Sequence, residues 1–162
     1  MPLATSVPLV LLAFISLYGI SLSYKTITRL RAYEQQSEKA AEWSTTAAER
    51  LHKTRTTQAG AAITLSLSAL ASLSLLTPLL AAPRSALPLA VLNTALLTAS
   101  RVHMQRFWNK RVQTQIPFVE KFNRAVKGSE ELVTVLQLLA LGWAAAGVLG
   151  WVAGNWRVAV LG

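Results

Sequence analysis

The chain contains no cysteine and no aspartate, and the two absences exclude several classes of protein. Without cysteine there can be no disulfide framework, no thiolate nucleophile and no cysteine-based metal site. Without aspartate, the paired-Asp magnesium sites that act on diphosphates are excluded as well. The chain has three Glu residues one helical turn apart, at 34, 38 and 42, which are more simply a solvated acidic face than a cation site. We therefore expect neither a metal nor a cofactor.

Charge is also scarce, because only 14% of the 162 residues are charged, whereas 52% are apolar and the mean hydropathy is +0.40. These values lie outside the range of ordinary globular domains. Between residues 59 and 100 the only charged residue is Arg84, which follows Pro83. A stretch of this length that is apolar on every face predicts a hairpin that crosses a bilayer twice, with arms at residues 59–82 and 85–102.

Two further apolar runs cover residues 5–24 and 132–154. A helix needs about 20 apolar residues to cross the hydrocarbon, so the four runs predict an all-α membrane protein with four transmembrane helices in a single membrane domain. The alternative for the first run is a secretory signal peptide that is cleaved after Ser23. That run begins without Lys or Arg and is followed by both, which is the reverse of the charge bias of a signal peptide.

The segments between these runs are polar. Residues 25–58 are rich in good helix formers and lack Pro and Gly, so we expect an exposed helix that continues the first span and turns back near residues 53–57. Residues 103–131 interleave basic and aromatic side chains. After Pro117 they predict a short amphipathic helix that lies in the headgroup region and ends at Gly128.

The distribution of cations predicts the topology. Of the 16 Lys and Arg residues, seven lie in residues 25–58 and seven in residues 101–131, which leaves only Arg84 and Arg157 elsewhere. The positive-inside rule therefore places both basic segments on the cytosolic or matrix side and both termini on the opposite side. An uncleaved first span suits the endoplasmic reticulum, and the mitochondrial inner membrane is the second choice.

Small residues offer candidate helix-packing positions. Ala146, Gly150 and Gly154 recur every four residues in the last span, and Ser68 and Ser72 do so in the second. Faces of this kind let helix backbones approach closely where lipid surrounds them. They predict contact with a partner subunit or with a second copy, and the simpler alternative is packing within the four-helix bundle.

Asn93 and Gln137 are the strongly polar side chains predicted to lie inside the spans. An unsatisfied amide in hydrocarbon costs a few kcal/mol, so each should face protein, where the two amides would bond to each other or to backbone, or line a ligand pocket. No ionisable residue lies deep in any predicted span, which argues against a pump, channel or coupled transporter.

The basic segment after the third run predicts contact with anionic lipid headgroups rather than nucleic acid, because it flanks apolar runs. No catalytic nucleophile with its base and orienting acid is evident near either His52 or His103. The residues expected to bind headgroups are Arg101, His103, Arg106, Lys110, Arg111, Lys121, Arg124 and Lys127.

The layout of four spans and two basic segments is similar to that of the membrane-associated proteins of eicosanoid and glutathione metabolism. Residues 101–103, which read Arg-Val-His, faintly resemble that family's Arg and His pattern at the end of the third span. The Arg-x-His-x-Asn-x-x-Glu block expected at the start of the second span has no counterpart, because residues 55–61 read RTTQAGA. The likeness is therefore one of layout, and family membership does not follow from it.

Three functions remain open. The leading hypothesis is a non-catalytic accessory or scaffold subunit of a larger membrane complex. The second is a small membrane enzyme or binding protein for lipid-like or glutathione-conjugated substrates, with the headgroup held by Arg101, Arg106 and Arg111 near His103. The third is a membrane-shaping hairpin protein.

Overall fold

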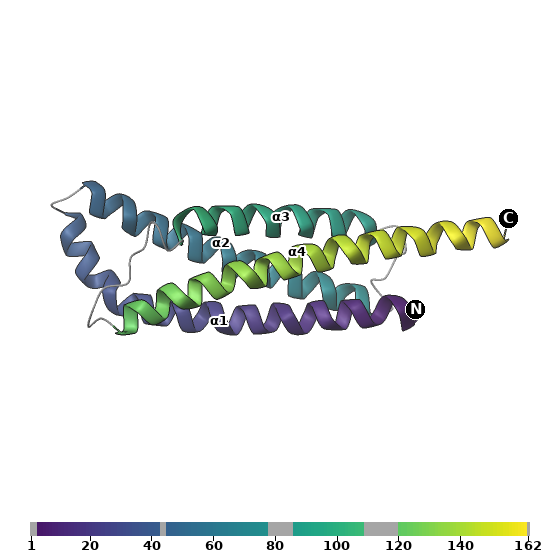
Figure 1. Ribbon diagram of the computed structural model, residues 1–162, viewed down its shortest axis with the longest axis horizontal. Helices are drawn as coiled ribbons and strands as arrows, with labels where there is room; N and C mark the ends of the chain where they lie inside the picture. The colour runs from purple at the N-terminus through teal and green to yellow at the C-terminus, as the bar shows by residue number, and fades with distance from the viewer. Residues whose placement is uncertain (1–2, 43–44, 78–85, 109–119, 162) are drawn as a thin grey trace.

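The computed structural model describes the backbone of residues 3–42, 45–77, 86–108 and 120–161. Side chains at 3–5, 32–41, 46–47, 86, 120–122 and 153–161 fall outside the description. Within these ranges the regular structure consists of four helices, so the prediction of an all-helical chain is confirmed (Figure 1). The helices are α1 (Leu3–Ala41), α2 (Thr45–Leu76), α3 (Ala86–Phe107) and α4 (Glu120–Leu161).

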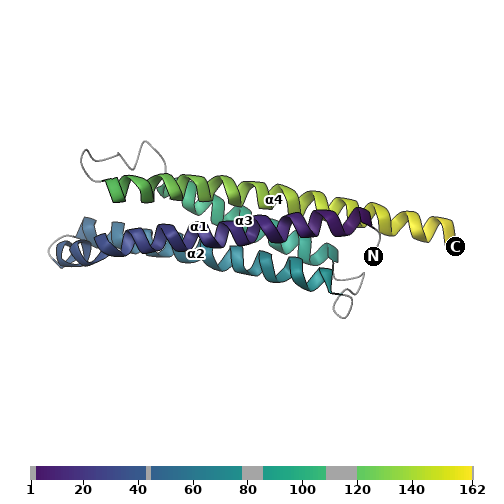
Figure 2. The ribbon, with the colours of Figure 1, turned by 90° about the horizontal axis from the view of Figure 1, so that it is seen from below.

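The four helices form an elongated bundle in which neighbours run antiparallel (Figures 1 and 2). Helix α1 packs against α2 and α4, and α3 packs against the same two helices. Helices α2 and α4 therefore lie on a diagonal and meet only across the centre. Only three residues separate α1 from α2, and a connection this short favours antiparallel neighbours.

The centre of the bundle is apolar and closely packed. Leu65, Leu97, Leu136 and Trp143 are each 0% exposed. The outer surface is apolar as well, with Phe14 67% exposed and Leu70 64% exposed. Water-soluble monomers rarely present apolar surface of this extent, whereas a lipid bilayer solvates it.

Three helices contain a segment that is long and apolar enough to cross a membrane: Ser6–Arg31 in α1, Ala48–Leu76 in α2 and Asn123–Val152 in α4. Helix α3 does not meet this criterion. The apolar part of α3 before its first charge, residues 86–100, is about 22 Å long at 1.5 Å per residue, against about 30 Å of hydrocarbon. The fourth predicted span stays a prediction.

The turn between the first two helices lies earlier than predicted. Helix α1 continues beyond residue 24 to Ala41, as expected, and α2 begins at Thr45, so the chain reverses between these two residues rather than at 53–57. No Pro or Gly marks this turn in the sequence. Its position follows from packing, because Thr57 and Gln58 are buried in the bundle and cannot form an exposed return. The predicted exposed helix at 25–58 is therefore the end of α1 followed by the start of α2.

The predicted short interfacial helix is instead the first part of α4, and the prediction that it ends at Gly128 is wrong. Helix α4 runs through Gly128 without a break. A Cβ at Gly128 would lie 2.6 Å from Thr26 Oγ1 of α1. The glycine thus permits two helices to touch and does not terminate one. Ala125 and Val126 are buried in the core, so this segment packs on the bundle; residues 109–119 lie outside the description.

The contact between α1 and α4 repeats every seven residues. A Cβ at Gly142 would lie 2.7 Å from Leu12 Cδ2, and a Cβ at Gly19 would lie 3.0 Å from Val135 Cγ1. Pairing at intervals of seven is the geometry of antiparallel helices that cross at a shallow angle. The three pairs are Leu12 with Gly142, Gly19 with Val135, and Thr26 with Gly128.

Candidate functional site

Hydrogen bonds cross the centre of the bundle at Ser68. Trp143 Nε1 donates to Ser68 Oγ at 2.8 Å, and the hydroxyls of Ser16 and Ser68 are 2.9 Å apart. Ser72 donates to the backbone oxygen of Ser68 at 2.8 Å, so its hydroxyl is used within its own helix. Of the two serines predicted to pack helices together, Ser68 connects α1, α2 and α4, whereas Ser72 is buried without joining another helix through its hydroxyl.

A second set of buried hydrogen bonds lies nearer the start of α2. Trp108 Nε1 donates to Thr57 Oγ1 at 2.9 Å, and Gln58 Nε2 donates to Ser129 Oγ at 2.8 Å. Ser129 in turn donates to the Ala125 carbonyl at 2.9 Å. Sequence reasoning missed both sets. The signal that would have found them is the indole N–H of a buried Trp, which requires an acceptor.

The predicted small-residue face of α4 is only partly used inside the bundle. Ala146 packs against the core, but a Cβ at Gly150 would meet nothing within 4 Å. The side chain position of Gly154 lies outside the description. Among the described glycines of α4 beyond Gly128, the close contacts are at Gly142 and Gly147, and a Cβ on Gly147 would lie 3.0 Å from Ala90 Cβ of α3.

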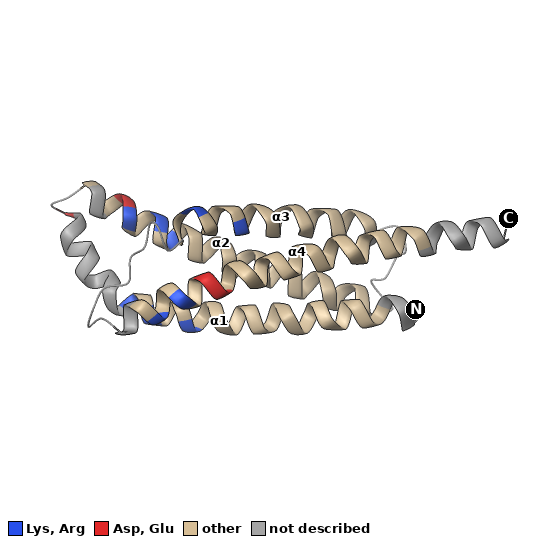
Figure 3. Ribbon diagram, viewed as in Figure 1, with Lys and Arg blue, Asp and Glu red and all other residues tan. Residues whose placement is uncertain are grey.

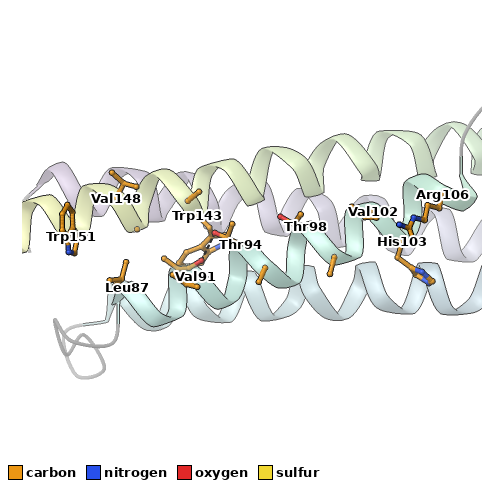
Figure 4. A pocket seen from close by; sticks show the side chains of 15 residues that line it. Leu87, Val91, Thr94, Thr98, Val102, His103, Arg106, Trp143, Val148 and Trp151 are labelled. Atoms are coloured by element: carbon orange, nitrogen blue, oxygen red, sulfur yellow. Dashed lines mark hydrogen bonds between the residues drawn. The ribbon is translucent and has the colours of Figure 1, made fainter.

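A large open groove runs between α3 and α4, with a volume of about 1050 Å³. Its walls are mostly small or apolar, and Trp143 lies between its ends. Figure 4 shows Leu87 and Trp151 at one end and His103 and Arg106 at the other. We call this feature the α3/α4 groove, and it is lined by Leu87, Ala90, Val91, Thr94, Ala95, Thr98, Ala99, Val102, His103, Arg106, Trp143, Ala144, Gly147, Val148 and Trp151.

The structure separates the two amides predicted to lie in the membrane. Asn93 is only 4% exposed, and its Nδ2 donates to the Leu89 carbonyl at 2.9 Å within α3. Gln137 is exposed on α4, so no described residue of its own chain covers it, and the expectation that it faces protein stays a prediction. The periodicity of α4 explains the difference, because Val135 and Leu139, two residues before and two after Gln137, are buried on the opposite side of the helix.

Gln137 lies on the same side of α4 as the α3/α4 groove. Residues 137, 144, 148 and 151 are spaced so that they share one helical face, and the last three line the groove. Gln137 is also at the middle of the apolar segment Asn123–Val152. The Gln137 amide therefore lies outside the groove, on the same face of α4 and two turns nearer the start of the helix, within an otherwise apolar stretch.

The described Lys and Arg residues gather at one end of the bundle (Figure 3). Of the predicted headgroup-binding residues, His103 and Arg106 are exposed on α3, and Arg124 and Lys127 are exposed on α4. Arg101 is half-buried, and its Nε is enclosed without a hydrogen-bond partner. Lys110 and Arg111 lie outside the description, as does the side chain of Lys121.

No family model, curated protein or solved structure matches this chain. Its function must therefore be inferred from geometry. Among the described residues, no three His or Glu side chains come together as a metal site would require. The α3/α4 groove offers apolar walls and small side chains, and the exposed amide of Gln137 lies on the same face of α4, a combination that suits association with another amphipathic or apolar molecule.

Proposed function

We propose that this chain is an integral membrane protein that acts by contact, as an accessory subunit whose α3/α4 groove receives a transmembrane helix of a partner. The observation that carries the proposal is the exposure of Gln137 at the middle of the apolar segment Asn123–Val152. A polar side chain on the outside of an apolar helix needs a partner if lipid surrounds that helix.

The apolar outer surface and the clustering of cations at one end support placement in a bilayer (Figure 3). In this placement the basic end of the bundle faces the cytosol or matrix, and both termini lie on the other side. Helix α3 forms the fourth span, with Arg101 extending toward the headgroups to compensate for its short apolar run. The endoplasmic reticulum remains our first choice of membrane and the mitochondrial inner membrane the second.

A helix satisfies the Gln137 amide better than an acyl chain does. An amide without hydrogen bonds in an apolar medium costs a few kcal/mol, and a hydrocarbon chain offers neither donor nor acceptor. A neighbouring helix can offer a polar side chain at the same depth. Interhelical hydrogen bonds in membranes contribute about 0.6 kcal/mol on average and up to about 1.7 kcal/mol.

The side chains that line the groove also favour a helix. Ala95 and Ala99 are four residues apart and exposed on α3, and Ala144 and Gly147 line the groove from α4. Small side chains at this spacing let a further backbone approach closely, and close backbone packing is the main source of helix association in lipid.

A second candidate function is the binding of a lipid-like amphiphile with an anionic headgroup. The position of His103 and Arg106 at one end of an apolar groove favours it, because a headgroup would lie at the basic end and a chain along the walls (Figure 4). An acyl chain would offer the Gln137 amide no hydrogen-bond partner along most of its length. We therefore place this function second.

Purification of the tagged full chain from native membranes in mild detergent tests the proposal. We expect a further transmembrane helix, from a different chain or from a second copy of this one, to co-purify in fixed stoichiometry, and Gln137→Leu to reduce its recovery. The matched control is Ser66→Leu, which makes a similar polar-to-apolar change on the exposed face of α2, away from the groove. A monomer in every detergent and in nanodiscs, with an anionic amphiphile bound, would instead support the second candidate.

A further inference from the structure

The exposed face of α4 carries a heptad pattern that no helix of the same chain covers. From Thr134 to Trp151, the residues of this pattern follow one another at alternating intervals of three and four. Each of these residues is exposed: Leu141 is 61% exposed, Val148 60% and Trp151 56%. This 3,4 spacing is that of the a and d positions of a two-helix contact. We call these residues the α4 seam: Thr134, Gln137, Leu141, Ala144, Val148 and Trp151.

We infer that the helix received by the groove is α4 of a second copy of this chain, in a parallel contact across a two-fold axis along the membrane normal. The inference rests on the proposed function and specifies its partner. Two copies inserted in the same orientation hold each seam residue at the same depth. A two-fold axis along the membrane normal then brings each seam residue opposite its own copy.

Gln137 makes the seam self-complementary. A carboxamide has both N–H donors and a carbonyl acceptor, so two copies of Gln137 can satisfy each other across the axis. A partner of different sequence would need a suitable polar residue at this same depth. The second copy has one by symmetry.

Nothing in the seam opposes the pairing of identical helices. No charged residue occurs between residues 132 and 156, so the two-fold contact brings no like charges together in the hydrocarbon. Ala144 lies near the middle of the seam, where a small side chain lets the two backbones approach. Ala144, Val148 and Trp151 also line the groove, so the second α4 covers its open side.

Cysteine crosslinking tests the contact directly, because the natural chain has no cysteine and one substitution gives one thiol. We would place Val148→Cys in the full chain, reconstitute it in bilayers at a range of protein-to-lipid ratios, and oxidise it. The matched control is Leu149→Cys, which is the next residue, is 51% exposed and points about 100° away around the helix. Light scattering of the unmodified chain in nanodiscs gives the mass of the complex independently.

The expected result is a disulfide-linked dimer for Val148→Cys, little dimer for Leu149→Cys, and a two-copy mass for the unmodified chain. Adding Gln137→Leu to Val148→Cys should lower the dimer fraction by about threefold or more at limiting protein-to-lipid ratio, which is the size expected for loss of one average interhelical hydrogen bond. Gln137→Asn, which keeps an amide, should lower it less.

Two results would overturn the inference, and they differ in what they say about the proposed function. If a single copy co-purifies with a different transmembrane chain and Gln137→Leu abolishes that complex, the accessory role stands and the two-fold contact is wrong. If the chain is monomeric under all conditions and neither cysteine crosslinks, both the contact and the accessory role are wrong.

Discussion

Trp143 on α4 donates its indole N–H to Ser68 on α2 over 2.8 Å, which joins the two helices that lie diagonally across the bundle. Because α2 and α4 make few other contacts, this hydrogen bond fixes their relative position along the bundle axis. Ser16 of α1 approaches the same hydroxyl, so one side chain connects three helices. The hydrogen bond between Trp143 and Ser68 thus positions α4, and the α4 seam and the groove lie on the outer side of that helix.

Ser68→Ala should destabilise the bundle by about 1–3 kcal/mol, because it leaves the buried Trp143 N–H and the Ser16 hydroxyl without their shared partner. Ser16→Ala should cost less, since Trp143 keeps its acceptor. Ser66→Ala is the control, because Ser66 is exposed and its hydroxyl bonds to the Ala62 carbonyl of the same helix. Unfolding in mixed micelles with increasing SDS measures the three values, and equal values for all three variants would contradict the role of Ser68.

Gly128→Ala should destabilise the bundle by about 1–3 kcal/mol, because the new Cβ would lie 2.6 Å from Thr26 Oγ1. The double variant Thr26→Ala with Gly128→Ala should recover most of this loss, since the clashing hydroxyl is gone. A double-mutant cycle in the same unfolding assay gives the coupling energy. At Gly60 a Cβ would meet nothing within 4 Å, so Gly60→Ala is the control and should be neutral or stabilising. Additive effects at 26 and 128 would show that the helices do not touch there.

Ser129→Ala should cost about 1–3 kcal/mol, because it leaves the buried Gln58 amide N–H without an acceptor. Gln58→Leu combined with Ser129→Ala should be closer to the unmodified chain than Ser129→Ala alone. Removing both polar groups leaves no unsatisfied donor, and it also removes Gln58 Oε1, which is buried without a hydrogen bond. A double variant that is less stable than Ser129→Ala alone would contradict this account.

The long apolar runs were sufficient to predict the helical class, but several boundaries depended on tertiary contacts. The reversal after Ala41 carries no Pro or Gly, and its local signal is limited to the Ser and Thr residues at 44–46, which are types that favour a helix start. At Gly128 the local signal was misleading. A glycine after an amphipathic stretch usually marks a helix end, and here it admits Thr26 of a helix a hundred residues earlier.

The candidate site was only partly predictable for a related reason. The sequence identified Asn93 and Gln137 as polar residues in apolar stretches, but which of them faces the interior depends on how each helix is rotated in the bundle. Asn93 is buried and bonds within α3, whereas Gln137 is exposed. The groove combines residues from α3 and α4 that are about fifty apart in sequence, and no spacing rule within one helix reveals it.

The central claim is that the bundle spans a bilayer with its basic end on the cytosolic or matrix side. Single cysteines at Arg50→Cys and His103→Cys, exposed near the basic end, and at Thr77→Cys, exposed after α2, test it with a membrane-impermeant maleimide on sealed membranes. We predict that the first two positions react together from the cytosolic or matrix face, and that Thr77→Cys reacts only from the other face. Labelling of Arg50→Cys and His103→Cys from opposite faces, or recovery of the chain in the soluble fraction with all three positions reactive, would contradict the claim.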